Sequence, residues 1–257
     1  MASVSVRKHF SVELGGSVVR GMLDLPQTKP EEGTPAVVLL CHGPPEVSEA
    51  ASGLLAQIAG ALVEAGVAAA GYEPSTDAQE RAVDDAAAVL HALALREDVD
   101  LNRIGVLGYS LGAIIAACLS GRSDQIARLC LLSAVTTDEL RSRRNSESSS
   151  ALAARLGAAD ASERFLNELA GLTPEEDIKR YDRPTLILHG AADRAVEPQS
   201  SLVYRDAVRL AGHQIEHALV ALADHAFTEG PVRSTCIEHI VRFFNIPSAR
   251  PVTGARS

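Results

Sequence analysis

A serine in a glycine-flanked turn is the residue of this sequence best suited to nucleophilic chemistry. Ser110 stands in Gly108-Tyr-Ser-Leu-Gly112, which matches the pattern Gly-x-Ser-x-Gly. The apolar residues 104–109 predict a strand, and residues 111–119 predict an apolar helix. Ser110 therefore lies at a tight turn between a strand and a helix. Such a turn requires small residues on both sides of the serine. The spacing predicts that Ser110 is a nucleophile held at the end of a strand.

A nucleophilic serine needs a base that takes its proton and an acid that orients the base. Of the eight histidines, His225 lies in a loop between a predicted strand and the last predicted helix, where it can reach the carboxyl edge of a parallel sheet. Asp193 follows the preceding strand, and we expect it to orient His225. The alternatives for this acid are Asp138, which follows the sixth strand, and Asp224, the neighbour of His225 in the sequence.

The turn around Ser110 and the chain order Ser110, Asp193, His225 resemble the α/β-hydrolase family over about residues 36–245. Within that family the sequence is most similar to small serine esterases of the dienelactone-hydrolase and cinnamoyl-esterase type. The resemblance implies a serine hydrolase that cleaves carboxylic esters or thioesters through an acyl-enzyme on Ser110. His225 would be the base and Asp193 the orienting acid, and the reaction would need no cofactor and no metal.

Residues 42–45 (His-Gly-Pro-Pro) resemble the family's loop after the third strand, which supplies a backbone N–H to the oxyanion hole. The two prolines at 44 and 45 have no N–H. The resemblance therefore implies Leu111, which follows the nucleophile, as one donor and Glu46 or Val47 as the other. If nothing replaces the lost donor, the alternative is a weakly active or non-catalytic binding protein with the same fold.

Two charged patterns suggest other chemistry. Residues 213–217 (His-Gln-Ile-Glu-His) match H-x-x-E-H, which binds zinc when both histidines share one face of a helix. Because Gly212 ends a helix and the next residues alternate as in a strand, we expect no metal there. Arg141, Arg143 and Arg144 would suit an acidic substrate or a lipid surface. Acidic residues crowd the same segment, however, so a solvated loop is our expectation.

Hydrophobic patterning predicts the elements that position these residues. Alternation on both sides of Gly15 and Gly16 predicts an antiparallel N-terminal hairpin. Apolar runs then alternate with amphipathic stretches, which predicts an α/β fold with a mostly parallel sheet and helices on both faces. The expected strands are 4–14, 18–25, 36–41, 67–72, 104–109, 129–133, 185–189 and 215–222. The expected helices are 51–64, 79–96, 111–119, 198–210 and 232–244.

The alternation stops after the sixth strand and resumes before the seventh. We therefore divide the chain into a hydrolase-like core of residues 1–134 and 182–246 and a small cap insert of residues 135–181. The tail, residues 247–257, is predicted to be disordered.

Within the insert, residues 141–150 (RSRRNSESSS) are polar and low in complexity, which predicts a mobile loop. Two amphipathic helices follow, at residues 151–156 and 163–169. We expect Tyr109, beside the nucleophile, to line a substrate pocket. Phe165 and Leu169 of the second helix would line this pocket with it or, equally well, pack onto the main domain.

Composition narrows the class of protein. The 257 residues are 46% hydrophobic, enough for a core that needs neither disulfides nor metal. The formal net charge of −9 argues against a nucleic-acid partner. The four cysteines form no close pair, no apolar run spans a membrane, and the N-terminus lacks the apolar block of a signal peptide. We expect a cytoplasmic protein whose partner is a small ester or thioester, and we predict no particular oligomeric state.

Overall fold

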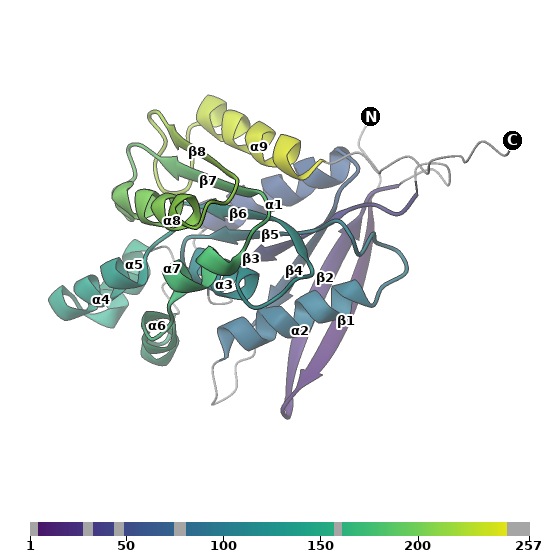
Figure 1. Cartoon of the computed structure of the whole chain (residues 1–257), viewed down its shortest axis with the longest axis horizontal. Coiled ribbons are helices and arrows are strands. Elements are labelled where there is room, and N and C mark those ends of the chain that lie inside the picture. Colours follow the sequence, from purple (N-terminus) through teal and green to yellow (C-terminus); the bar gives the residue numbers. More distant parts are fainter. Residues whose placement is uncertain (1–4, 28–32, 44–48, 75–80, 157–160, 246–257) are drawn as a thin grey trace, which may run out of the picture.

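The computed structural model describes residues 5–27, 33–43, 49–74, 81–156 and 161–245. Its centre is an eight-stranded sheet in the order β1-β2-β4-β3-β5-β6-β7-β8 (Figure 1). The strands are β1 (Val6–Leu14), β2 (Ser17–Leu25), β3 (Val37–Cys41), β4 (Ala68–Glu73), β5 (Ile104–Tyr109), β6 (Ile126–Leu132), β7 (Thr185–Gly190) and β8 (Ile215–Val220). β1 and β2 pair antiparallel, β2 is antiparallel to β4, and the remaining pairs are parallel. The expected α/β-hydrolase fold class is confirmed.

The N-terminal hairpin turns as its sequence predicts. Leu14 lies opposite Ser17, so only Gly15 and Gly16 form the turn. Their φ angles are +58° and +91°, which glycine adopts without steric cost.

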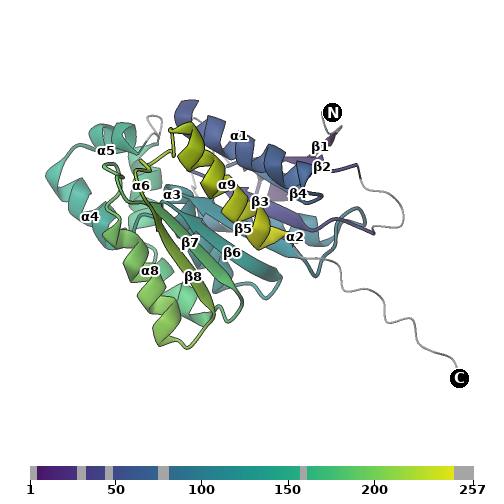
Figure 2. The ribbon, with the colours of Figure 1, turned by 90° about the horizontal axis from the view of Figure 1, so that it is seen from above.

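Helices cover both faces of the sheet. They are α1 (Glu49–Glu64), α2 (Ala82–Ala94), α3 (Leu111–Ser120), α4 (Thr137–Ser146), α5 (Ser149–Arg155), α6 (Glu163–Ala170), α7 (Pro174–Asp177), α8 (Gln199–Leu210) and α9 (Gly230–Phe244). Buried side chains of α1 and α9 form one hydrophobic core with the sheet, and those of α2, α3 and α8 form the other. Figure 2 shows α1 and α9 side by side over the sheet. Every residue of β3 and β5 is buried, because both faces are covered.

The segment between β6 and β7 contains α4 to α7. Figure 2 shows α4 and α5 at the end of the sheet where the parallel strands finish. α7 packs against α3 instead, with Asp177 beside Gly121 at the C-terminal end of α3. The apolar side chains of the segment join the core on the α3 and α8 side. A short 3₁₀ helix, Ile178–Arg180, follows α7. α4, α7 and this 3₁₀ helix were not expected from the sequence.

The prediction of a loop at residues 141–150 is wrong, because most of that segment belongs to α4 and α5. The Thr136 hydroxyl accepts the Glu139 N–H at 3.1 Å and so caps α4. Arg143 pairs with Glu139 one turn away at 2.6 Å, and Leu140 is fully buried. A cap, ion pairs and a single apolar anchor stabilise a helix whose sequence lacks an apolar stripe.

The expected disordered tail, residues 247–257, lies outside the described residues. Among the described helices, none combines the length and apolar character needed to span a membrane.

Candidate active site

Ser110 occupies the turn between β5 and α3 in a strained backbone conformation, with φ of +55°. The two flanking glycines make this turn possible. A Cβ at Gly108 would lie 2.5 Å from the Gly112 carbonyl oxygen, and a Cβ at Gly112 would lie 2.2 Å from the Cys41 carbonyl oxygen. Both distances are too short for any side chain. The glycines therefore allow α3 to pack against β3 and β5 directly behind Ser110.

The structure brings the three predicted residues together at the carboxyl edge of the sheet. His225 Nε2 lies 3.0 Å from Ser110 Oγ, and His225 Nδ1 lies 2.8 Å from Asp193 Oδ2. Ser110 follows β5, Asp193 follows β7 and His225 follows β8. The three residues therefore lie in three different segments that follow parallel strands at the same edge of the sheet.

The hydrogen-bond partners decide where the protons lie. Ionised Asp193 only accepts hydrogen bonds, so Nδ1 of His225 carries the hydrogen that it donates to this carboxylate. In the neutral ring Nε2 is then an acceptor, and it faces the Ser110 hydroxyl as donor. Serine, imidazole and carboxylate thus stand in the order that proton removal from Ser110 requires.

The Asp193 carboxylate is completely buried yet well supplied with donors. Its Oδ1 accepts the backbone N–H groups of Ala195 and Val196, at 2.8 and 2.9 Å. Burial by itself would raise the pKa of Asp193. The contacts with the imidazoles of His189 and His225 and the Val196 N–H outweigh burial and hold this pKa well below its usual range. Asp193 is therefore a carboxylate at neutral pH.

Two hydroxyl groups hold the backbone of His225 in place. Tyr109 Oη donates to the His225 carbonyl oxygen at 3.3 Å, and Ser133 Oγ donates to the same oxygen at 3.1 Å. Ser133 directly follows β6, is fully buried and has a φ of +47°. Sequence reasoning missed Ser133, although a small polar residue at the carboxyl end of a parallel strand is the type of residue that marks this edge.

The two alternative acids do not touch His225. The Asp138 side chain is 92% exposed and pairs with Arg141 at 3.0 Å. The Asp224 carboxylate accepts the Thr228 N–H at 2.8 Å and the Thr228 hydroxyl, which stabilises the turn after β8. Of the three acids considered, only Asp193 reaches the imidazole.

One of the two expected oxyanion donors lies within the described residues. Leu111 is the first residue of α3, so its N–H is one of the helix-terminal groups that have no partner within the helix. Glu46, with Pro44, Pro45 and Val47, lies outside the described residues. His42, at the end of β3, places Nε2 3.0 Å from the Tyr72 carbonyl oxygen of the neighbouring strand β4.

The residues considered for a substrate pocket are buried. Phe165 and Leu169 pack into the core between the insert and α3, with 6% and 0% of their surfaces exposed. Tyr109 is 2% exposed, and its ring lies 5.3 Å from the His225 ring, centroid to centroid. The apolar face of α6 thus joins the insert to the core, which is the packing alternative, and Tyr109 contacts the expected base.

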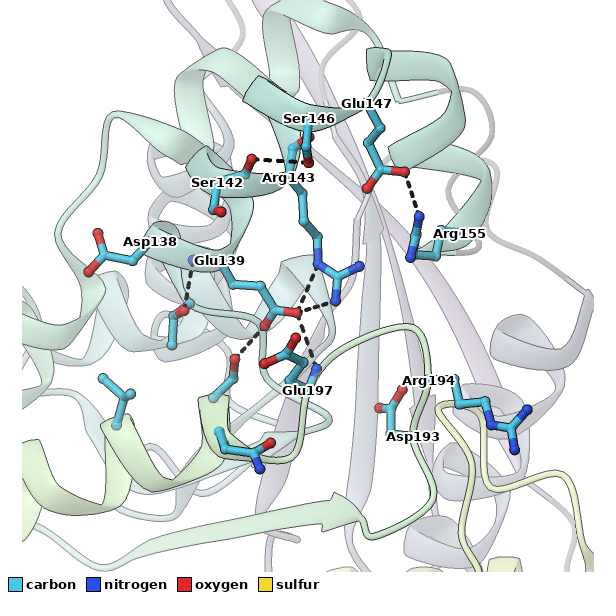
Figure 3. Close-up of a pocket in the computed structure, with 14 residues that line it drawn as sticks. Asp138, Glu139, Ser142, Arg143, Ser146, Glu147, Arg155, Asp193, Arg194 and Glu197 are labelled. Carbon is cyan, nitrogen blue, oxygen red and sulfur yellow. Dashed lines mark hydrogen bonds and ion pairs between the residues drawn. The ribbon is translucent and has the colours of Figure 1, made fainter.

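A cavity of about 760 Å³ lies between the insert and the loop that carries Asp193 (Figure 3). Charged side chains dominate its walls, among them Glu139, Arg143, Arg155 and Arg194. Glu139 connects the two sides. Its Oε1 accepts the Glu197 N–H at 3.1 Å and a hydrogen bond from Arg143, while its Oε2 accepts the Ser200 hydroxyl. The cavity beside the acid is thus polar, and its two sides are held together by one carboxylate.

The H-x-x-E-H pattern lies at the start of β8, not on a helix. His213 Nε2 is 2.9 Å from the Lys179 carbonyl oxygen, and His217 Nε2 is 3.0 Å from Ser201 Oγ. In the ranges that the structure describes, no group of three His, Cys, Asp or Glu side chains is placed to hold a metal ion. Two arginines of the basic cluster make contacts within the protein: Arg141 donates to the Ala170 carbonyl oxygen at 2.7 Å, and Arg143 pairs with Glu139.

Comparison with known proteins identifies the family. The model of the prolyl oligopeptidase family matches residues 73–246, from the end of β4 through α9. The chain belongs to the prolyl oligopeptidase family. This match contains Ser110, Asp193 and His225, and the family member described here is a serine hydrolase. Comparison with curated protein sequences gives no match.

Solved structures share the fold of this family member at low sequence identity. Est1E from Butyrivibrio proteoclasticus superposes with a TM-score of 0.72 and 19% identity, over 91% of this chain and 96% of that one. An esterase domain from Rhodothermus marinus gives 0.69 and 18%, over 93% and 98%. The acylaminoacyl peptidase of Pyrococcus horikoshii gives 0.70 and 15%, over 95% of this chain and 42% of that one. These likenesses establish the α/β-hydrolase fold.

Proposed function

We propose that this serine hydrolase cleaves carboxylic esters or thioesters through an acyl-enzyme formed on Ser110. The observation that carries the proposal is the continuous chain of contacts from Ser110 Oγ through the His225 ring to Asp193 Oδ2, at 3.0 and 2.8 Å. A serine alcohol is a weak nucleophile, and a base at hydrogen-bond distance is what activates it.

In the first half of the reaction Ser110 Oγ attacks the acyl carbon while His225 Nε2 takes its proton. The imidazolium that forms is stabilised by Asp193, which stays ionised. The negative charge that develops on the acyl oxygen faces the Leu111 N–H at the start of α3. Collapse of the tetrahedral intermediate breaks the bond to the alcohol or thiol, which leaves with the proton from His225.

In the second half a water molecule takes the place of the alcohol or thiol. His225 removes a proton from this water, which attacks the acyl carbon of the ester on Ser110. Collapse of the second intermediate releases the carboxylic acid, and His225 returns its proton to Ser110 Oγ. The cycle consumes one water molecule and leaves the residues as they began, so it needs no cofactor.

The proposal is supported by the fold of two esterase structures that cover this chain almost from end to end. The ester assignment itself is tested with a panel of p-nitrophenyl esters of graded acyl length, their thioester counterparts and matching p-nitroanilides. Because charged side chains line the cavity beside Asp193, the panel includes polar and charged acyl groups.

We expect turnover of esters or thioesters by the wild-type protein and background rates with Ser110→Ala. The substitution removes one oxygen from a buried turn, so the thermal unfolding midpoint of the variant should match that of the wild type. Turnover of anilides in preference to esters would replace the proposal with a peptidase or amidase. Equal turnover by Ser110→Ala would remove Ser110 from the mechanism, and no turnover of any substrate would favour a binding protein with this fold.

A further inference from the structure

A second histidine approaches the acid of the proposed catalytic unit. His189 is the penultimate residue of β7, four positions before Asp193, and its side chain is completely buried. Its Nε2 lies 3.2 Å from Asp193 Oδ2, the oxygen that also receives His225 Nδ1. The carboxylate therefore lies between two imidazole rings, and the mechanism proposed above uses only one of them.

The surroundings of His189 determine which nitrogen carries its hydrogen. Nε2 lies between two acceptors, because it is also 3.3 Å from the Val196 carbonyl oxygen. A lone pair at Nε2 would face two oxygens, so the hydrogen belongs there. Nδ1 is buried and has no hydrogen-bond partner among the described residues, so a hydrogen on that nitrogen would face no acceptor. His189 is thus the Nε2–H tautomer, with its N–H directed at the turn that carries Asp193.

The His189 N–H contacts the turn at residues 193–196 at two points, the Asp193 carboxylate and the Val196 carbonyl oxygen. The backbone N–H of Val196 donates to Asp193 Oδ1, and the carbonyl oxygen of the same residue receives the His189 hydrogen bond. His189 thereby holds the turn through Val196 and places the positive end of an N–H dipole beside Oδ2. A carboxylate with donors at both oxygens cannot rotate without losing some of them.

We propose that His189 is a positioning residue for catalysis: it fixes Asp193 Oδ2 in line with His225 Nδ1 by clamping the acid-bearing turn. The inference rests on the proposed function, since positioning matters only if Asp193 orients a catalytic base. Among the described residues, the titratable group in contact with His189 is Asp193, on the turn after β7. His225, from the loop after β8, shares the same Asp193 oxygen, and His217 on the neighbouring strand β8 interacts electrostatically with His189.

The test compares two substitutions of similar size. In His189→Gln the side-chain amide can place an N–H close to the former Nε2, whereas His189→Met fills the same space without a donor. We expect His189→Met to lower kcat about ten-fold, the factor expected for one lost hydrogen bond near a charged group, with KM unchanged. His189→Gln should stay within about three-fold of the wild type. His189→Leu repeats the apolar substitution if the Met variant does not fold.

Two further readouts separate positioning from a packing role. A carboxylate with one N–H fewer attracts the His225 imidazolium more strongly, so the acid limb of kcat/KM should move to higher pH in His189→Met and stay in place in His189→Gln. The proton resonance of His225 Nδ1–H, measured without substrate, should shift only in the apolar variant. His213→Met, which removes the partner of the Lys179 carbonyl oxygen, is the control and should change neither quantity.

Equal kcat in folded Gln and Met variants, with matching pH profiles and Nδ1–H resonances, would overturn the positioning role. A failure of the proposed function looks different. In that case the wild type shows no turnover that depends on Ser110, while the Nδ1–H resonance still responds to His189→Met and not to His189→Gln.

Discussion

Tyr109 Oη donates a hydrogen bond to the backbone carbonyl oxygen of His225 at 3.3 Å, across 116 positions of sequence. The residue immediately before the proposed nucleophile thus holds the residue proposed as its base. Tyr109→Phe should lower kcat about five-fold, because about 1 kcal/mol of hydrogen bonding to the His225 backbone is lost while ring packing stays.

Ser133→Ala removes the other hydroxyl on the same carbonyl oxygen and provides the matched comparison. Each single variant leaves one hydroxyl in place, so we expect the double variant to lose more activity than the product of the two single effects. Steady-state kinetics of the wild type, the two single variants and the double variant checks this. Purely multiplicative effects on kcat would mean that the two hydroxyls do not jointly hold the His225 backbone.

Replacing the acid should separate Asp193 from the two other candidates. Asp193→Asn should lower kcat on the order of 10³- to 10⁴-fold, because the amide cannot stabilise the imidazolium and favours the wrong imidazole tautomer. Asp138→Asn and Asp224→Asn should stay within about three-fold, since neither carboxylate contacts His225. A larger loss of turnover in Asp138→Asn would move the assignment to the acid after β6.

Glu139 couples the insert to the loop that carries Asp193. Its carboxylate accepts the Glu197 N–H and the Ser200 hydroxyl, both outside the insert. Glu139→Gln should lower kcat about five- to ten-fold through a less fixed acid loop. Glu147→Gln is the control, because it disrupts an ion pair with Arg155 at 2.7 Å that lies within the insert. Equal kcat values for the two variants would mean that the contacts of Glu139 with the Asp193 loop do not affect catalysis.

The turn around Ser110 should not tolerate a larger residue at its second glycine. Gly112→Ala places a Cβ 2.2 Å from the Cys41 carbonyl oxygen, so we expect a loss of about 3 kcal/mol or more in the free energy of unfolding. Gly60→Ala in α1 meets nothing within 4 Å and should gain roughly 0.5–1 kcal/mol. Urea unfolding measures both, and an unchanged stability of Gly112→Ala would contradict the close packing of α3 on β3.

Most strands, and the turn that carries Ser110, could be predicted because their sequence patterns are local. β3 and β5 are continuous apolar runs, since both faces of the sheet are covered. Ser110 lies in a motif whose glycines are required by close backbone contacts. Its partners follow from chain order once the strands are placed.

The remaining features depend on contacts that spacing does not reveal. α4 has one fully buried anchor, Leu140, and is stabilised by a cap and ion pairs, so its sequence is typical of a loop. The apolar face of α6 suits a pocket wall and a core equally well, and Phe165 and Leu169 pack in the core. Ser133 contacts His225, 92 positions further along the chain, and the contact of His189 with Asp193 depends on how the turn after β7 folds, so only the folded chain shows either contact.

The most direct test of the account is the position of a covalent adduct. A fluorophosphonate reacts with a serine that a neighbouring base activates, and peptide mass spectrometry locates the modified residue. We expect one adduct per chain, on Ser110, formed at a rate that falls sharply in His225→Ala. No adduct, an adduct on another residue, or an undiminished rate in His225→Ala would contradict the account.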